Sequence, residues 1–136
     1  WFTFTLVRNP WDRMVSYYHW LRAQSFAHPA VGLAQSLDFA AFLAHPLTQR
    51  TIGAHPYGSY LRLPDGQEVA RAFLRLEALE EDAAALEAHL GFRVTPLPRA
   101  NESARGRDWH AYYSDETAAL VARLCAEDIA RFHYSF

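Results

Sequence analysis

The first 22 residues, WFTFTLVRNPWDRMVSYYHWLR, restrict the fold more than any other part of the sequence. Residues 1–7 are apolar or β-branched, which is typical of a fully buried strand of a parallel sheet. The pair Asn9-Pro10 suits the N-cap and the first turn of a helix, so we expect a helix over 10–24. This sequence predicts an α/β fold in which Arg8 stands at the carboxyl end of a parallel strand, where such folds bind ligands.

The composition is that of a globular chain without a general surface for polyanions. Hydrophobic residues make up 51% of the 136 residues, aromatic residues 15%, and the net charge is −2. A chain of this kind is not expected to bind nucleic acid, and any phosphate binding must depend on a few placed arginines. All thirteen basic residues are arginine, and together with the abundant alanine this hints at a bacterial, GC-rich source.

Cysteine usage and hydropathy exclude several other classes of function. The one cysteine, Cys125, cannot form a disulfide framework or a cysteine metal site, and its helix-like surroundings predict a small buried hydrophobe. No apolar run reaches the roughly 18–20 residues that span a bilayer, so we expect no membrane contact from this segment.

The rest of the chain predicts alternating helices, short strands and loops. We expect Glu80, Glu81 and Asp82 to form a solvated face at the start of a helix. The predicted elements are a loop over 25–35, a short helix over 37–43 capped by Ser36, an irregular loop over 46–59, a hairpin turning at Pro64-Asp65-Gly66, a strand over 72–76, a helix over 79–90 ended by Gly91, a polar loop over 92–108 and a helix over 115–132 capped by Ser114.

The string LVRNPWDRMVSYYHWL closely resembles the 3′-phosphate-binding motif of sulfotransferases that use PAPS (3′-phosphoadenosine-5′-phosphosulfate). That motif is an apolar strand, then Arg-[Asp/Asn]-Pro, a two-residue gap, Arg, and then Ser and usually Tyr. In that family the residues that correspond to Arg8 and Ser16 hold the 3′-phosphate, so the resemblance implies a cofactor-binding role for both. The matching positions here are Arg8, Asn9, Pro10, Arg13, Ser16 and Tyr18.

The resemblance extends over nearly the whole chain and implies a fold. FLRLEALEEDAAALEAHLG, LPRANES, YYSDETAALV and the closing DIARFHYSF resemble, in this order, the carbohydrate-type (family 2) sulfotransferases. This resemblance implies a P-loop-NTPase-like sulfotransferase fold, with a parallel central sheet flanked by helices. We therefore expect one sulfotransferase domain over 1–136, with the 3′-phosphate-binding motif at 1–22.

Arginines of the late loop are further candidates for cofactor binding. Arg99, Arg105 and Arg107 flank the sequence Asn101-Glu102-Ser103. Basic residues of the late loop close over the 3′-phosphate in related sulfotransferases, so the resemblance implies this role for Arg99 and Arg105. A solvated loop is the alternative interpretation of the same residues.

The sequence departs from the family in one element. These enzymes carry a P-loop-like 5′-phosphosulfate loop with a lysine or arginine, upstream of the strand that begins here. The sequence GAHPYGS at 53–59 has the glycine spacing of a Walker-type phosphate loop. However, Ser59 stands where the lysine of that loop would be, and no strand is predicted before it. We therefore expect an N-terminally truncated domain, with the phosphosulfate-loop lysine and the catalytic base upstream of residue 1. His19 and His55 are candidates for the catalytic base, but a solvated or capping role is favoured for them. The sequence therefore assigns no catalytic residue.

These observations predict transfer of a sulfuryl group from PAPS to a hydroxyl of a carbohydrate or glycolipid, leaving the bisphosphate PAP, without a metal. The alternative is a non-catalytic remnant of the fold that binds PAP or PAPS. A P-loop kinase relative is disfavoured because the Walker motif and an acidic Mg²⁺ site are missing from the sequence. We expect a cytoplasmic location, with a Golgi-type anchor upstream as the alternative; the acceptor and the oligomeric state are not specified by the sequence.

Overall fold

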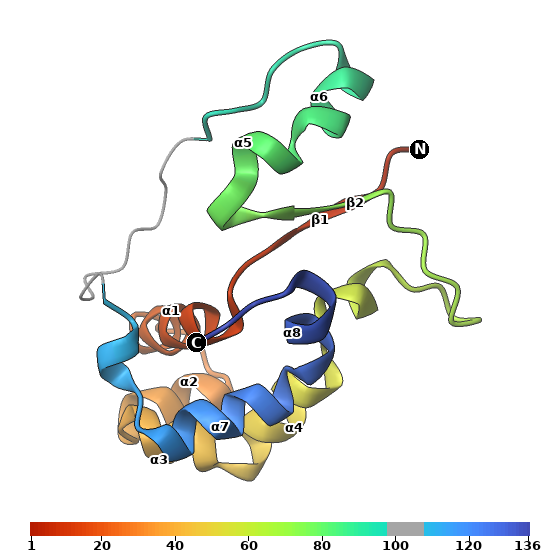
Figure 1. Ribbon diagram of the computed structural model, residues 1–136. Helices are drawn as coiled ribbons and strands as arrows, with labels where there is room; N and C mark the ends of the chain where they lie inside the picture. Colours follow the sequence, from red (N-terminus) through yellow and green to blue (C-terminus); the bar gives the residue numbers. More distant parts are fainter. Residues whose placement is uncertain (98–107) are drawn as a thin grey trace. The chain divides into compact units, whose positions relative to one another are not determined.

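The computed structural model describes residues 1–97 and 108–136, and in it the chain forms two compact units (Figure 1). The first unit consists of Trp1–Arg8 and His55–Asn101, and the second of Asn9–Ala54 and Glu102–Phe136. The described residues form a mixed α/β structure that is mostly helical. None of the helices in the described part of the chain is both long and apolar enough to cross a membrane.

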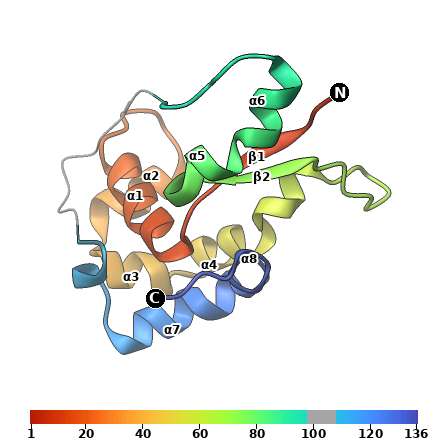
Figure 2. The ribbon, with the colours of Figure 1, turned by 45° about the horizontal axis from the view of Figure 1, so that its top comes forward.

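The first unit is built on a parallel pair of strands. β1 (Phe4–Val7) pairs with β2 (Ala72–Arg75), with Phe4 opposite Ala72 and Val7 opposite Arg75 (Figure 2). The parallel pairing and the strand at 72–76 were expected from the sequence and are confirmed. The other elements of this unit are the 3₁₀ helices η1 (Tyr57–Leu61) and η2 (Leu76–Ala78) and the helices α5 (Leu79–Asp82) and α6 (Ala84–Leu90).

The prediction that residues 1–7 form a fully buried strand is wrong. Val7 is completely buried, but Phe4 and Leu6 each keep 40% of their surface exposed. The sheet of the described residues has two strands, so β1 has one neighbouring strand and is not central in it. Burying both faces of a strand requires neighbouring layers on both sides, and β1 is covered only in part.

The predicted hairpin exists in a reduced form. Arg62 and Glu68 form an isolated antiparallel bridge, and their side chains form an ion pair with Nε and Oε2 3.7 Å apart. The turn between them contains Gly66 at φ +86°, a conformation that glycine adopts without a steric cost. The predicted helix over 79–90 is interrupted at Ala83, and Gly91 ends it in the left-handed conformation, as expected.

The second unit is helical, and two of its helices were missed. Residues 25–35 and 46–59 were predicted to be loops, but they contain α2 (Pro29–Ser36) and α4 (Pro46–Ala54). Proline was taken as a loop signal, whereas both helices begin at a proline, where its missing N–H costs nothing. The remaining helices are α1 (Pro10–Arg22), α3 (Phe39–Ala44), the 3₁₀ helix η3 (His110–Tyr112), α7 (Asp115–Leu124) and α8 (Ala126–Phe132).

The N-cap of α3 differs from the sequence prediction, whereas the N-cap of α7 agrees with it. Ser36 ends α2 rather than capping the next helix, and the N-cap of α3 is Asp38, whose carboxylate accepts the N–H of Ala41 at 2.8 Å. Ser114 caps α7 through a capping box with Thr117, as expected for a serine in this position. The predicted helix over 115–132 breaks at Cys125 (φ −108°, ψ 23°), where neither proline nor glycine signals it.

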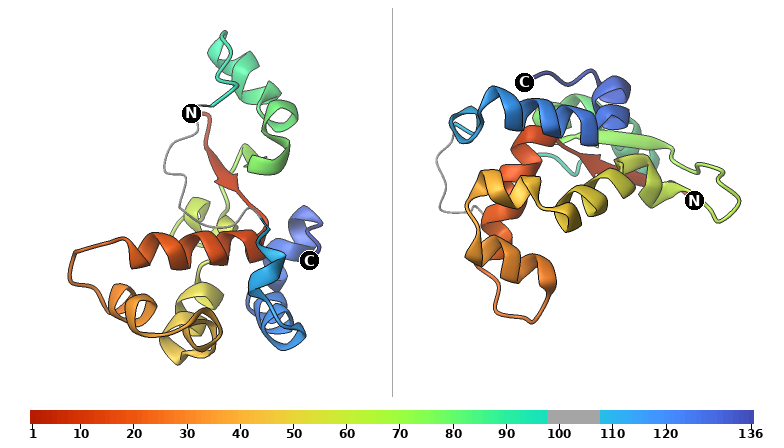
Figure 3. Two further views of the ribbon diagram at one scale, coloured as in Figure 1. Left: turned by 90° about the vertical axis from the view of Figure 1, so that its left-hand side faces the viewer. Right: turned by 90° about the horizontal axis from the view of Figure 1, so that it is seen from below.

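The core of the second unit gathers around α1, which contacts α2, α3, η3 and α7 (Figure 3). The most deeply buried large side chains include Phe42, Met14 and Leu21. The cluster consists of Trp11, Met14, Val15, Tyr18, Leu21, Val31, Ala34, Phe39, Phe42, Leu43, Val121 and Cys125. The apolar positions along α1 therefore mark a core face of the helix.

Cys125 is buried between α7 and α8, which confirms its predicted role as a small core residue. Burial raises the pKa of its thiol to about 11. Because the thiolate is the reactive form, we expect iodoacetamide not to alkylate Cys125 in the folded protein at pH 8, and to alkylate it fully in urea. Mass spectrometry of the intact chain measures both states, and rapid labelling without denaturant would contradict the buried position.

Asp82 is not part of a solvated face, contrary to the sequence prediction. Its Oδ2 accepts the Nε–H and the backbone N–H of Arg75, and its Oδ1 accepts an Nη2–H, with all three distances between 2.7 and 2.8 Å. This pair joins the end of β2 to α5. The hydrogen bonds from the Arg75 side chain are the main cause that lowers the pKa of Asp82 below 3.8.

We expect Asp82→Asn to lower the free energy of unfolding at pH 7 by about 1 kcal/mol, a value reduced for solvent screening because Arg75 is partly exposed. A lowered carboxyl pKa stabilises the folded state above its unfolded pKa, and the contribution disappears as the pH falls through the folded pKa. The difference from wild type should therefore shrink below about pH 4. Urea unfolding at several pH values measures it, with the exposed Glu80→Gln as the matched control; a pH-independent difference would contradict this account.

Candidate functional site

Arg8 directly follows β1, at the edge where the two parallel strands end together. The last residue of β1, Val7, stands opposite Arg75, the last residue of β2. Arg8 is half-buried, so its guanidinium is neither in the core nor fully solvated. The carboxyl edge of parallel strands is where α/β folds bind ligands, and the structure places Arg8 there, as the sequence predicted.

The junction between Arg8 and α1 has the local structure that the sequence predicted. The Oδ1 of Asn9 accepts the N–H of Trp11 at 3.0 Å, and Pro10 occupies the first turn of the helix. The Nδ2 of Asn9 also donates to the carbonyl of Ser135 at 3.0 Å. The start of α1 is thus fixed by a local cap and by a residue far away in the sequence.

Two more hydrogen bonds hold the first turn of α1. The indole Nε1–H of Trp11 donates to the carbonyl of Ala118 at 3.0 Å, and the hydroxyl of Tyr113 donates to the carbonyl of Trp11 at 2.7 Å. Burial raises the pKa of Tyr113 well above its usual range, so its hydroxyl stays protonated and continues to donate. These polar contacts fix the first turn of α1 against α7 and the segment before it, within the second unit.

Ser16 lies near the middle of α1 and is half-buried. Its hydroxyl makes no hydrogen bond to any residue in the described ranges, including the carbonyl one turn earlier in the helix. A serine within a helix often bonds back to such a carbonyl, so this hydroxyl keeps its donor capacity. The side chain is available to a ligand without breaking an internal contact.

The predicted cofactor-binding residues do not all fall in one described region. Arg8 belongs to the first unit and Ser16 to the second. Arg99 and Arg105, together with Arg107, lie outside the described residues, and their predicted role stays a prediction. No three His, Cys, Asp or Glu side chains gather at metal-binding distance in the described part of the chain.

The other candidates are His19, His55 and the sequence GAHPYGS. The Nε2 of His19 is 3.1 Å from the hydroxyl of Tyr112, which is a structural contact. The sequence GAHPYGS follows a helix rather than a strand, because it runs from the end of α4 into η1, and this confirms that it lacks the strand that a phosphate loop requires. His55 lies between these two elements.

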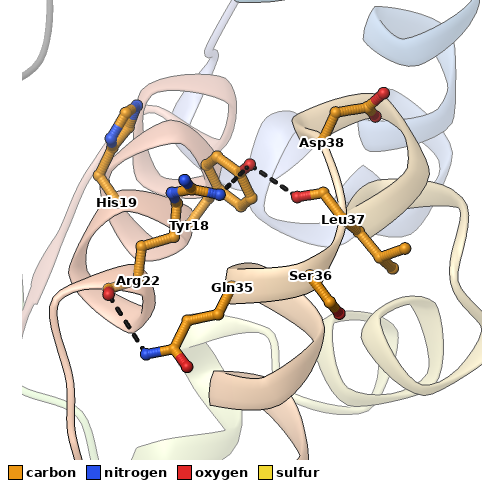
Figure 4. A pocket seen from close by; sticks show the side chains of 7 residues that line it. All are labelled: Tyr18, His19, Arg22, Gln35, Ser36, Leu37 and Asp38. Atoms are coloured by element: carbon orange, nitrogen blue, oxygen red, sulfur yellow. Dashed lines mark hydrogen bonds between the residues drawn. The ribbon is translucent and has the colours of Figure 1, made fainter.

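Sequence reasoning missed a pocket at the far end of α1 from Arg8. It has a volume of about 520 Å³ and is lined by Tyr18, His19 and Arg22 from α1, by Gln35 and Ser36 at the end of α2, and by Leu37 and Asp38 from the α2–α3 connection (Figure 4). The hydroxyl of Tyr18 donates to the carbonyl of Leu37 at 2.8 Å and accepts an Nη1–H of Arg22 at 3.0 Å. Tyr18 and Arg22 are four residues apart in the sequence, but the helix α2, whose last residues line the pocket, was not predicted.

Comparisons with known proteins identify no relative of this chain. No protein-family model, no curated protein and no solved structure matches it.

The different environments of two hydroxyl groups on α1 give a direct test of the site. Tyr18 is 6% exposed, and removing its hydroxyl deprives the half-buried carbonyl of Leu37 of this donor and Arg22 of one acceptor, so we expect Tyr18→Phe to lower the free energy of unfolding by about 1 kcal/mol. Ser16→Ala should change it by less than about 0.5 kcal/mol. Urea unfolding followed by circular dichroism measures both, and a large loss for Ser16→Ala would show that its hydroxyl has a structural role.

Proposed function

We propose that this chain is part of a carbohydrate-type sulfotransferase that transfers a sulfuryl group from PAPS to a hydroxyl of a carbohydrate or glycolipid. The observation that carries the proposal is the sequence LVRNPWDRMVSYYHWL together with its local structure. Arg8 follows a parallel strand, Asn9 and Pro10 begin a helix, and the hydroxyl of Ser16 in that helix bonds to no residue of the described ranges. We also propose that the α/β structure belongs to a P-loop-NTPase-like sulfotransferase fold.

The donors of Arg8 and Ser16 suit a phosphate group. A guanidinium offers a planar fork of N–H donors that matches two phosphate oxygens, and a serine hydroxyl adds a third donor. Both side chains are half-buried, where charge-assisted hydrogen bonds are less screened than on an open surface. This chemistry supports the assignment of the two residues to the 3′-phosphate of the nucleotide.

The residues of this chain would bind and orient rather than react. Bound PAPS would supply the activated sulfuryl group. Arg8 and Ser16 would each donate hydrogen bonds to the 3′-phosphate of the nucleotide. Positioning of this kind contributes to in-line transfer because the reacting atoms must be aligned. A cytoplasmic location belongs to the same proposal.

The test uses adenosine 3′,5′-bisphosphate, the desulfated cofactor, in calorimetric titration. We expect Arg8→Ala to weaken binding by about 2 kcal/mol, the scale of a lost charge-assisted contact, and Ser16→Ala to weaken it by about 1 kcal/mol. Arg71→Ala is the matched control, because Arg71 is an exposed arginine of the same unit, and its affinity should equal that of wild type.

Adenosine 5′-monophosphate makes the test specific for the 3′-phosphate. It lacks that group, so its affinity should not respond to Arg8→Ala. Circular dichroism establishes that each variant is folded. Equal affinities of wild type and Arg8→Ala for the bisphosphate, or a folded wild type that binds neither nucleotide, would contradict the proposed site. If binding is confirmed, radiolabelled PAPS and a panel of glycans distinguish the enzyme from a non-catalytic remnant.

A further inference from the structure

The tripeptide Ala-His-Pro occurs three times in the chain, at 27–29, 44–46 and 54–56. The first two copies stand directly before α2 and α4, which begin at Pro29 and Pro46. A residue before proline is restricted to extended backbone, which is the conformation that an N-cap needs. His28 has φ −150° and ψ 139°, and His45 has φ −67° and ψ 131°. Both histidines therefore have the backbone of a helix cap.

Both histidines also cap their helix with a ring nitrogen. Nδ1 of His28 accepts the N–H of Ala30 at 3.2 Å, and Nδ1 of His45 accepts the N–H of Leu47 at 3.2 Å. Because the proline at the first helical position has no N–H, these two amides are the first donors of α2 and α4 that need an acceptor. A nitrogen that accepts carries a lone pair, so both imidazoles are neutral, with their proton on Nε2.

The third copy of Ala-His-Pro shows that the tripeptide alone does not create such a cap. In front of η1 the N-cap residue is Pro56 itself, so His55 lies outside the cap position. The arrangement needs histidine at the cap and proline at the first helical position. It occurs at α2 and α4, and both helices belong to the second unit (Figure 1).

In the described part of the chain, no charged side chain bonds to either imidazole. The ring of His28 makes one other contact, to the ring of Phe26, with centroids 6.4 Å apart, and the ring of His45 makes none. α2 packs on α1 and α3, and α4 packs on α3 and α7. The titratable and charged groups of these elements are Asp12, Arg13, Tyr17, Tyr18, His19 and Arg22 of α1, Asp38 before α3, Arg50 of α4, and Asp115, Glu116 and Arg123 of α7.

We propose that His28 and His45 together form a pH-sensitive device that releases the first turns of α2 and α4 when both imidazoles are protonated. An imidazolium has an N–H on each nitrogen, so its Nδ1 no longer accepts the amide and instead directs a donor at a donor. Its positive charge also lies at a helix N-terminus, where the helix dipole disfavours it. Imidazole changes its charge between about pH 5 and 8, so both helices respond to mild acid.

The direction of the pH effect follows from the number of bound protons. The folded state holds both imidazoles neutral, whereas the unfolded chain places no such restriction on them. The unfolded state therefore binds more protons in mild acid, and the free energy of unfolding falls as the pH decreases from about 7 to 5. Because α2 packs on α1, and α4 on α3 and α7, the release reaches the core of the second unit. The inference involves neither Arg8 nor Ser16 and does not depend on the proposed function.

Asparagine variants keep the caps and remove their titration, because the amide oxygen of asparagine accepts an N–H at all of these pH values. Urea unfolding at about pH 7.5 and about pH 5 gives the equilibrium constant for unfolding of the wild type and of His28→Asn/His45→Asn. On acidification, the constant of the wild type should rise at least about ten-fold more than that of the double variant, since losing one cap corresponds to roughly five-fold. The other histidines are present in both chains, so their contributions cancel.

His133→Asn is the matched control. His133 ends α8 at φ 57°, a conformation that asparagine tolerates, and its ring makes no hydrogen bond to a described residue. The pH effect of this variant should stay within about two-fold of the wild-type effect.

Nitrogen-15 spectra of the wild type test the caps directly. At about pH 7.5 the rings of His28 and His45 should be neutral and protonated on Nε2, and the amide signals of Ala30 and Leu47 should move as the rings titrate. A ring that carries its proton on Nδ1, or amide signals that do not move between the two pH values, would overturn the inference. An equal pH effect in the wild type and in the folded double variant would overturn it as well. The ring spectra decide the question even if the double variant does not fold.

Discussion

The start of α1 depends on hydrogen bonds from residues that lie more than a hundred positions later in the chain. Asn9 bonds to the carbonyl of Ser135, Trp11 to that of Ala118, and Tyr113 to that of Trp11. The two that involve Trp11 are partly buried and use polar atoms that would otherwise be left unsatisfied as the surrounding aromatic side chains pack. The direction of α1 in its unit, and with it the position of Ser16 and of the Tyr18 pocket, follows from these contacts.

Within α1, structural and available polar groups alternate along the helix. Tyr18 is in the core, and its hydroxyl connects Arg22 to Leu37. Ser16, half a turn earlier, makes no such contact with the described residues. An apolar stripe at helical spacing therefore does not show which neighbouring polar side chains are hydrogen-bonded inside the protein. Their hydrogen bonds are known only when the elements that pack against the helix are known.

The sequence was most informative where local chemistry has few alternatives. Asn9-Pro10 predicted the beginning of α1, Gly91 the end of α6, and Ser114 the cap of α7, because cap residues satisfy backbone groups within one turn. It failed where tertiary packing decides. Pro29 begins a helix that packs on α1 and α3, Pro46 begins one that packs on α3 and α7, and the exposure of Phe4 depends on which layers cover β1. Arg75 and Asp82 could be seen as a pair only once η2 had turned the chain back.

The order of the two units along the chain has a consequence for how the protein folds. The segment from Asn9 to Ala54 belongs entirely to the helical unit, yet it separates β1 from β2 in the sequence. Closing a flexible loop of that length costs conformational entropy before the strands can pair. Helices with mostly local contacts form faster than distant strands associate, and each one shortens the loop that remains to be closed. The parallel sheet is therefore expected to be the last part to assemble, and its formation rate to depend on substitutions in helices that do not belong to it.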